Sequence, residues 1–209
     1  LVGFIPAVTV NGDAVTRVAK GDTVRSHFTR TPTVSTTFAP AMTIPEGTDQ
    51  TVDNKTMSVD TYATVQIPWT GEDMKHVNNG SGFETIYGDQ IRQAMRAICN
   101  TIELSLFTTA YQGASRATGT AGTTPFASTI DVVADVRKIL VDNGCPMDGG
   151  VSLVMNTAAG AAMRKLTNLY KVNEAGGSDM LRQGVLLDLQ GLMLRESAQI
   201  SQVTKGTGA

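Results

Sequence analysis

Residues 29–56 limit most strongly what this chain can fold into. They contain nine threonines and three prolines, with few large apolar side chains after Phe38. Threonine favours extended backbone, but a segment with so little to bury cannot build a core of its own. A stretch of this length without regular structure is also uncommon inside a compact domain. The composition therefore predicts an extended two-stranded arm, which would be stabilised by lying on another subunit.

Strand patterns flank this arm on both sides. Residues 24–28 predict a short strand with Val24 and Phe28 on one face. Residues 57–69 alternate between apolar and polar side chains, which is the period of a strand with one buried face. Pro68 ends this second strand or places it at a sheet edge.

The longest helical pattern runs from about residue 84 to residue 112. The sequence Ser-Gly-Phe-Glu at 81–84 matches a capping box, and Gly113 provides a natural stop. Apolar residues recur along one stripe at three- and four-residue spacing: Ile91, Met95, Ile98, Ile102 and Leu106. The pattern predicts a helix of roughly 40 Å, which is long enough to act as a structural spine.

The second half of the chain predicts a small α/β unit. A helix opens at Ser128-Thr129-Ile130-Asp131, and a short strand is expected over 151–155. A further helix follows from Thr157 to about 166, capped by Asn156 or Thr157. Residues 168–180 are expected to form a loop, and the hydrophobic segment 184–197 is expected to turn at Gly191 into a return strand. The inward positions of the first helix are Val133, Val136 and Leu140.

The charge distribution excludes several classes of function. The formal net charge is −2, charged residues make up 17% of the chain, and no run of Lys or Arg resembles a nucleic-acid patch. A sequence-reading DNA or RNA binder is therefore not expected, although loose, non-specific contact with nucleic acid stays open. No apolar run approaches the length of a membrane span. Cys99 and Cys145 are expected to be free thiols.

No catalytic, cofactor-binding or metal-binding residue is expected. His27 and His76 are the two histidines, and both are expected at the surface, without the spacing that a metal site requires. Glu72 and Asp73, near Asp60, are interpreted as solvated charges after a strand end. The alternative is a carboxylate pair of the kind that general acid–base chemistry uses.

The charged residues in and around the arm are candidates for contact between subunits. Charges of both signs at such a position can pair with a neighbour and fix its register. The alternative is that they are simply solvated. The candidate residues are Arg25, Arg30, Glu46, Asp49, Asp53 and Lys55.

Three local segments resemble the major capsid (coat) proteins of tailed bacteriophages. Val-Ala-Lys-Gly-Asp-Thr-Val-Arg at 18–25 is similar to the segment that leads into the extended loop of that family. Ala-Met-Arg-Ala-Ile-Cys-Asn-Thr-Ile-Glu-Leu at 94–104 is similar to its spine helix. Residues 184–197, with Leu-Gln-Gly at 189–191, are similar to its return strand. The family's amino-terminal arm and carboxyl-terminal strands have no counterpart here, so we expect a fragment of a longer protein.

The resemblance implies an α+β phage capsid fold. Residues 1–28 would lead into the arm (29–56), the peripheral domain would comprise 57–125 and 188–209, and 126–187 would form the axial domain. The spine helix at about 84–112 would belong to the peripheral domain.

The resemblance also implies a function and partners. The chain would be a structural subunit of a virion that self-assembles, in the bacterial cytoplasm, into hexamers and pentamers around double-stranded DNA. Its partners would be further copies of itself, with scaffolding, portal or decoration proteins, and with no membrane and no cofactor. The alternatives are an encapsulin-like compartment shell and a small hydrolase that uses Glu72, Asp73 or Asp60.

Overall fold

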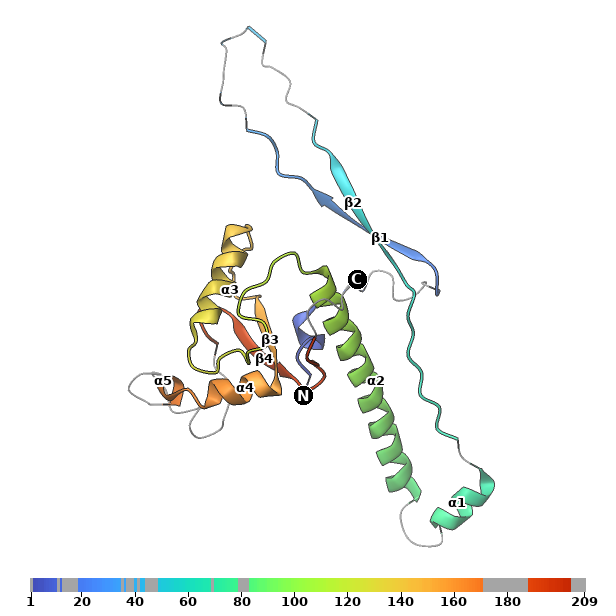
Figure 1. Cartoon of the computed structure of the whole chain (residues 1–209). Helices are drawn as coiled ribbons and strands as arrows, with labels where there is room; N and C mark the ends of the chain where they lie inside the picture. Colours follow the sequence, from blue (N-terminus) through green and yellow to red (C-terminus); the bar gives the residue numbers. More distant parts are fainter. Residues whose placement is uncertain are drawn as a thin grey trace. The chain divides into compact units, whose positions relative to one another are not determined.

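The structure, a computed structural model, is described here for residues 2–10, 12, 19–34, 36, 40, 42–43, 49–68, 70–78, 83–170 and 188–203. It divides into two compact units, one of Leu1–Thr9 with Thr64–Ala209 and the other of Val10–Ala63. Helices and strands are mixed, so the predicted α+β class is confirmed (Figure 1).

The unit Val10–Ala63 contains a two-stranded antiparallel hairpin (Figure 1). Strand β1 (Thr23–Thr29) pairs with β2 (Val52–Ser58). Beyond the ladder, the Gly21 amide donates to the Val59 carbonyl at 2.8 Å, and the Val59 amide donates to the Asp22 carbonyl at 3.0 Å. The predicted strand at 24–28 is therefore confirmed, and the bounds 29–56 of the predicted two-stranded arm stay a prediction. Within the predicted arm (29–56), the paired residues are Thr29 and 52–56, and the rest of β1 precedes it.

The predicted long strand over 57–69 is wrong. β2 ends at Ser58, and no described strand pairs with residues 59–68. Its alternating side chains do not share a buried face, because Met57 is 60% and Val65 is 44% exposed. Period-2 alternation therefore reports an extended backbone here, without the sheet partner that would make it a strand. Trp69 lies outside the described residues.

A short helix that the sequence analysis did not predict, α1 (Gly71–Asn78), follows this segment. Thr70 and Asp73 form its capping box: the Asp73 amide donates to Thr70 Oγ1 at 3.2 Å, and the Thr70 amide donates to Asp73 Oδ2 at 3.2 Å. The Thr-x-x-Asp signal was present in the sequence, but these acids were interpreted as charges after a strand end.

The long helix is confirmed as α2 (Phe83–Gly113), within one residue of its predicted ends. The first two residues of its predicted capping box, 81 and 82, lie outside the described residues.

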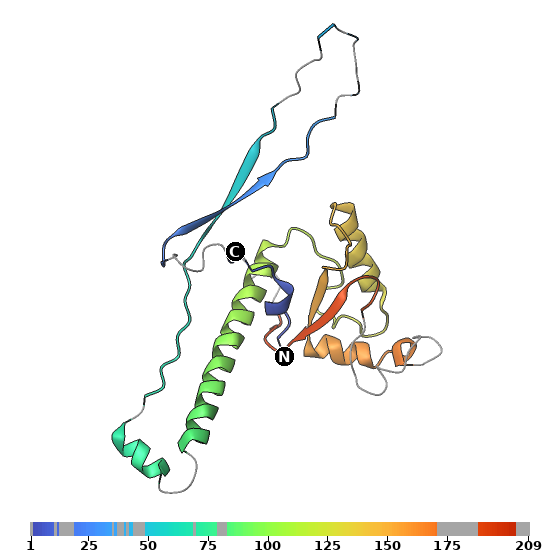
Figure 2. The same cartoon turned by 180° about the vertical axis from the view of Figure 1, so that it is seen from behind.

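The second half of the chain folds into an α/β lobe, defined here as residues 126–166 with 189–197 (Figure 2). Its elements are α3 (Asp131–Asp142), β3 (Ser152–Asn156), α4 (Thr157–Arg164) and β4 (Met193–Ser197), with β3 and β4 parallel. The core lies inside this lobe and consists of Phe126, Val133, Met155, Ala159, Met163 and Leu192. Val136 and Leu140 pack against it, so the inward face predicted for α3 is confirmed.

Several local predictions in the lobe can be compared with the structure. The Asn156 side chain accepts from the Ala159 amide at 2.8 Å, so the predicted cap of α4 is confirmed. α3 begins after Ile130 without a side-chain cap. The predicted turn at Gly191 is confirmed, since Gln190 and Gly191 both have positive φ. A one-turn helix, α5 (Thr167–Tyr170), occupies the start of the predicted loop, and 171–180 lie outside the described residues.

The return strand belongs to the sheet of the lobe. β4 pairs along its full length with β3, from Ser152 opposite Met193 to Asn156 opposite Ser197. The sequence analysis grouped residues 188–209 with the long helix, and that division into domains stays a prediction. An amino-terminal 3-10 turn, η1 (Ile5–Ala7), completes the described elements of this unit.

Candidate assembly surfaces

The hairpin carries two faces of different character. Alternate residues of a strand point to opposite sides, so Val24 and Phe28 share a face with Met57, which lies directly opposite Val24. Phe28 is 49% and Met57 is 60% exposed. The same face also carries Ser26, Asp53 and Lys55. The other face carries one apolar residue, Val52, among seven polar ones: Thr23, Arg25, His27, Thr29, Asn54, Thr56 and Ser58. A two-stranded ribbon with an uncovered apolar face is marginally stable alone, so this face is a candidate contact surface.

Two of the predicted contact charges pair with each other inside the hairpin. The Arg30 guanidinium donates to the Asp53 carboxylate, and their side chains are 71% and 25% exposed. Such an exposed pair contributes about 0.2–1 kcal/mol, so it helps the hairpin only slightly. This pairing was not expected, because both residues were interpreted either as candidates for contact with a neighbouring subunit or as solvated charges.

The remaining predicted contact charges lie at different places. Arg25 is exposed on the polar face, Lys55 is exposed on the face that carries Met57, and Asp49 is exposed before β2. Glu46 lies outside the described residues. The contact role of these four residues stays a prediction.

The apolar stripe of α2 is largely uncovered. Ile91 is 43%, Met95 is 57% and Ile102 is 40% exposed. The sequence predicted this stripe correctly from its spacing, but the described residues do not bury it. Because large open apolar surfaces are typical of contact sites, this stripe is a further candidate contact surface.

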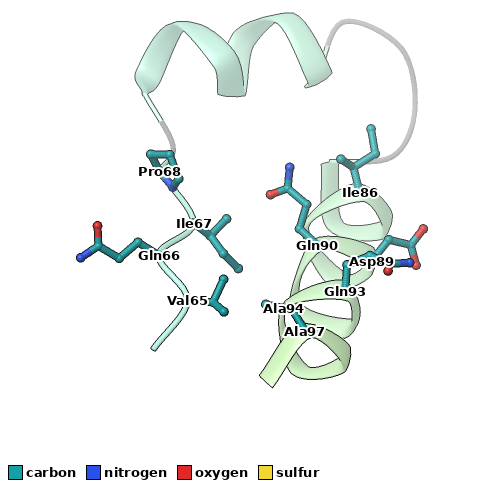
Figure 3. A pocket seen from close by; sticks show the side chains of 10 residues that line it. All are labelled: Val65, Gln66, Ile67, Pro68, Ile86, Asp89, Gln90, Gln93, Ala94 and Ala97. Atoms are coloured by element: carbon teal, nitrogen blue, oxygen red, sulfur yellow. The ribbon is translucent and has the colours of Figure 1, made fainter. Parts of the chain in front are cut away.

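A groove of about 650 Å³ runs between the extended segment 65–68 and the first half of α2 (Figure 3). Val65 and Ile67 point toward Ala94 and Ala97 across the groove, and Gln66 points away from the helix. The groove is open to solvent and mostly apolar, with polar groups at its edges, so it is a second candidate contact surface.

An ion pair links α4 to β4 in the lobe. Arg164 donates through two nitrogens to the two carboxylate oxygens of Glu196, each at 2.7 Å, and these hydrogen bonds raise the pKa of Arg164. Gly160 makes room for the carboxylate, since a Cβ at that position would lie 1.6 Å from Glu196 Oε1. The sequence analysis did not identify this pair, because residues 32 positions apart carry no local signal.

The acidic residues considered for catalysis have other partners. Thr70 donates a hydroxyl hydrogen bond to Asp73 at 2.6 Å, which lowers the pKa of Asp73. Asp60 accepts from the Thr61 hydroxyl at 2.8 Å. Glu72 lies exposed in the first turn of α1, as solvated charges do.

The predicted surface histidines and free cysteines agree with the structure. His27 and His76 are exposed, and Cys99 and Cys145 are free thiols. In the described part of the chain, no group of three His, Cys, Asp or Glu side chains is arranged to hold a metal ion. No helix among the described residues combines the length and apolarity that crossing a bilayer requires.

Comparisons with known proteins give one informative similarity. No family model matches the sequence, and no curated protein matches it. A solved structure from Mycobacterium phage Che8 is similar, with a TM-score of 0.72 and 18% sequence identity. The similarity covers 96% of this chain and 70% of the phage chain. The chain therefore shares its fold with a phage protein.

Proposed function

We propose that the chain is a structural subunit of a viral or prophage capsid and that it is not an enzyme. Copies of it would assemble through head-to-tail contacts into closed rings, hexamers and pentamers, and so into a shell around double-stranded DNA. Scaffolding, portal or decoration proteins would be its further partners. It would act in the virion, after assembly in the bacterial cytoplasm.

The observation that carries this proposal is the uncovered apolar face of the β1–β2 hairpin. Phe28 and Met57 expose apolar surface, and Val24 lies half-buried on the same face, on a ribbon that has no core of its own. The hairpin would be stabilised when this face lies on a second copy, because burial removes apolar area from water. An enzyme would gain nothing from such a ribbon unless it lined a substrate site.

Two further observations support the same conclusion. The apolar stripe of α2 and the groove beside residues 65–68 offer surfaces on which a neighbouring copy can be buried. The fold shared with a protein of Mycobacterium phage Che8 supports a viral structural role.

The test uses two matched double variants of the full chain. V24T with M57T makes the apolar face of one cross-strand pair polar and keeps residues that favour strands. H27T with N54T changes the directly paired residues His27 and Asn54 on the opposite face. Electron microscopy and sedimentation velocity would compare the assemblies that form. We expect rings or shells from the unchanged chain and from the control, and monomers from V24T/M57T.

The outcomes separate the proposal from its alternatives. If the unchanged chain stays monomeric under conditions that assemble related coat proteins, or if both variants assemble equally, the hairpin role is wrong. Shells that enclose a protein cargo in place of DNA would favour an encapsulin-like compartment. Turnover of ester, glycoside or phosphate substrates, lost on changing Glu72 or Asp73, would favour a hydrolase.

A further inference from the structure

A buried carboxylate holds the amino-terminal segment against the long helix. Among the described residues, Glu103 is the one charged side chain that is fully buried. Its Oε1 accepts from the Ile5 amide at 2.9 Å, and its Oε2 accepts from the Phe4 amide at 3.1 Å. The Ser197 hydroxyl donates to the same Oε2 at 3.0 Å. Three segments that are distant in sequence therefore meet at one side chain.

Among the described residues, hydrogen-bond donors surround the Glu103 carboxylate. Glu103 forms no ion pair within the described part of the chain. Its partners include two successive backbone amides at the start of η1, where the free N–H groups of a helical turn favour an anion. A buried carboxylate that loses these donors is strongly disfavoured, so Glu103 and the segment hold each other in place.

Residues 2–8 also contact the sheet of the lobe. A Cβ added to Gly3 would lie 2.7 Å from Val154 Cγ1 and 3.1 Å from the Glu196 carbonyl, so the backbone passes directly against β3 and β4. On the other side, the Phe4 ring lies 6.1 Å from the ring of Phe107 on α2. Figure 2 shows η1 between α2 and the β3–β4 sheet.

Little else joins α2 to the lobe. The buried core contains no α2 residue. Among the described elements, α2 contacts α1 and η1 more than it contacts α3, α4, β3 or β4. The direct tie is the Ser197 hydrogen bond to Glu103. Residues 2–8 supply further contact between helix and lobe, and residues 114–118, which follow α2 directly, line a pocket together with Val136, Ile139 and Leu140 of the lobe.

We propose that residues 2–8 are a releasable clasp, locked by Glu103, that fixes α2 relative to the α/β lobe. With the clasp engaged, helix and lobe move as one body. With it released, the lobe keeps its own core while the helix and the lobe reorient independently. A polar lock suits this role, because three hydrogen bonds exchange with water more readily than a packed apolar core separates. The proposal does not depend on the shell function.

The test compares Glu103→Gln with the control Glu72→Gln, which removes an exposed carboxylate from α1. The side-chain amide that replaces the Glu103 carboxylate turns an NH₂ group toward one of the three donors and removes the charge. We expect amide hydrogen exchange of Phe4 and Ile5 to accelerate at least tenfold in Glu103→Gln. Exchange along β3 and β4 stays unchanged, and the control resembles the unchanged chain.

A distance measurement tests the hinge itself. Spin labels at Gln112 in α2 and Asp135 in α3, both exposed, report on helix and lobe in a Cys99→Ser/Cys145→Ser background. We expect a narrow distribution of the distance between the two labels when Glu103 is present. We expect a broad distribution after Glu103→Gln. Gly3→Val, which crowds β3 and β4 and leaves Glu103 in place, should broaden it as well. A distribution that stays narrow, or equal loss of protection in β3 and β4, would overturn the proposal.

Discussion

Gly160 permits a close contact in the lobe because glycine has no side chain. Glu196 occupies the space where a Cβ would stand, and the two hydrogen bonds from Arg164 prevent its carboxylate from swinging away freely. We expect Gly160→Ala to lower the free energy of unfolding by about 1–3 kcal/mol through overpacking, measured by urea unfolding at neutral pH.

A second glycine in a helix provides the matched control. Gly88 in α2 has nothing within 4 Å of an added Cβ. Gly88→Ala should therefore stabilise by about 0.5–1 kcal/mol, because alanine restricts the unfolded chain and favours helix. If the free energy of unfolding falls in Gly160→Ala and rises in Gly88→Ala, the close packing at Gly160 is supported. A loss of the same size at both positions would contradict it.

Asp73 predicts a pH dependence at the start of α1. The Thr70 side-chain and backbone hydrogen bonds lower the pKa of Asp73, so its contribution is fully present above the unfolded pKa of about 3.9. It is lost as the pH falls further, through the lower folded pKa. We expect the first turn of α1 to fray in that acidic window, observed as NMR shift changes at Thr70 and Asp73. Asp73→Asn should fray at neutral pH, whereas Glu72→Gln should not.

Among the helices and strands, the sequence predicted correctly those elements whose signals lie within a few neighbouring residues. The spacing of Ile91 and its neighbours predicted α2, and the capping box at 81–84 and Gly113 predicted its ends within one residue. Asn156 or Thr157 was predicted to cap α4, and Asn156 is the cap. The residues that form these signals lie close together in the sequence, so the signals do not depend on contacts with distant segments. The capping box at Thr70 was equally local, but it was overlooked because the preceding alternation favoured a strand.

Contacts between distant segments could not be predicted in this way. Residues 59–68 alternate as a strand does, yet a strand needs a partner, and the sequence of one segment does not state whether a partner exists. The same limit hid the Arg30–Asp53 pair and the burial of Glu103, whose donors lie more than 90 residues away. The apolar stripe of α2 was found, but its exposure was not.

The hairpin provides a prediction at this scale. As a two-stranded ribbon with an open apolar face, it should exchange its backbone amides rapidly in the monomer. We expect the amides of β1 and β2 to become protected at least tenfold in the assembled state, by hydrogen exchange and mass spectrometry. β3 and β4 serve as the internal control and should be protected in both states. If the amides of β1 and β2 exchange at the same rate before and after assembly, the hairpin does not take part in the contact between copies.

Taken as a whole, the chain has its described core and its hairpin in different units. The unit Leu1–Thr9 with Thr64–Ala209 holds the core, and the unit Val10–Ala63 holds the hairpin. Replacing residues 23–58 with Asn-Gly joins Asp22 to Val59, whose backbones are already hydrogen-bonded, by a two-residue turn. We expect the unfolding midpoint of the core unit to change little while assembly is abolished.

The measurements are thermal unfolding by circular dichroism and sedimentation velocity. The H27T/N54T variant is the control, because it keeps the hairpin at full length. A shortened chain that unfolds at a much lower temperature would show that the core unit depends on the hairpin. A shortened chain that still assembles would remove the hairpin from the proposed contact.

The hydrogen bonds among Gly21, Asp22 and Val59 hold the two chain segments together at the base of the hairpin. The length of the hairpin beyond this base can therefore change without moving the base. Inserting one residue into each strand extends the ribbon by about 3.3 Å, while the two points where the chain departs and returns stay side by side. If copies of the chain assemble through the hairpin, its length would set the spacing between neighbouring copies. Paired insertions in β1 and β2 would then lengthen that spacing.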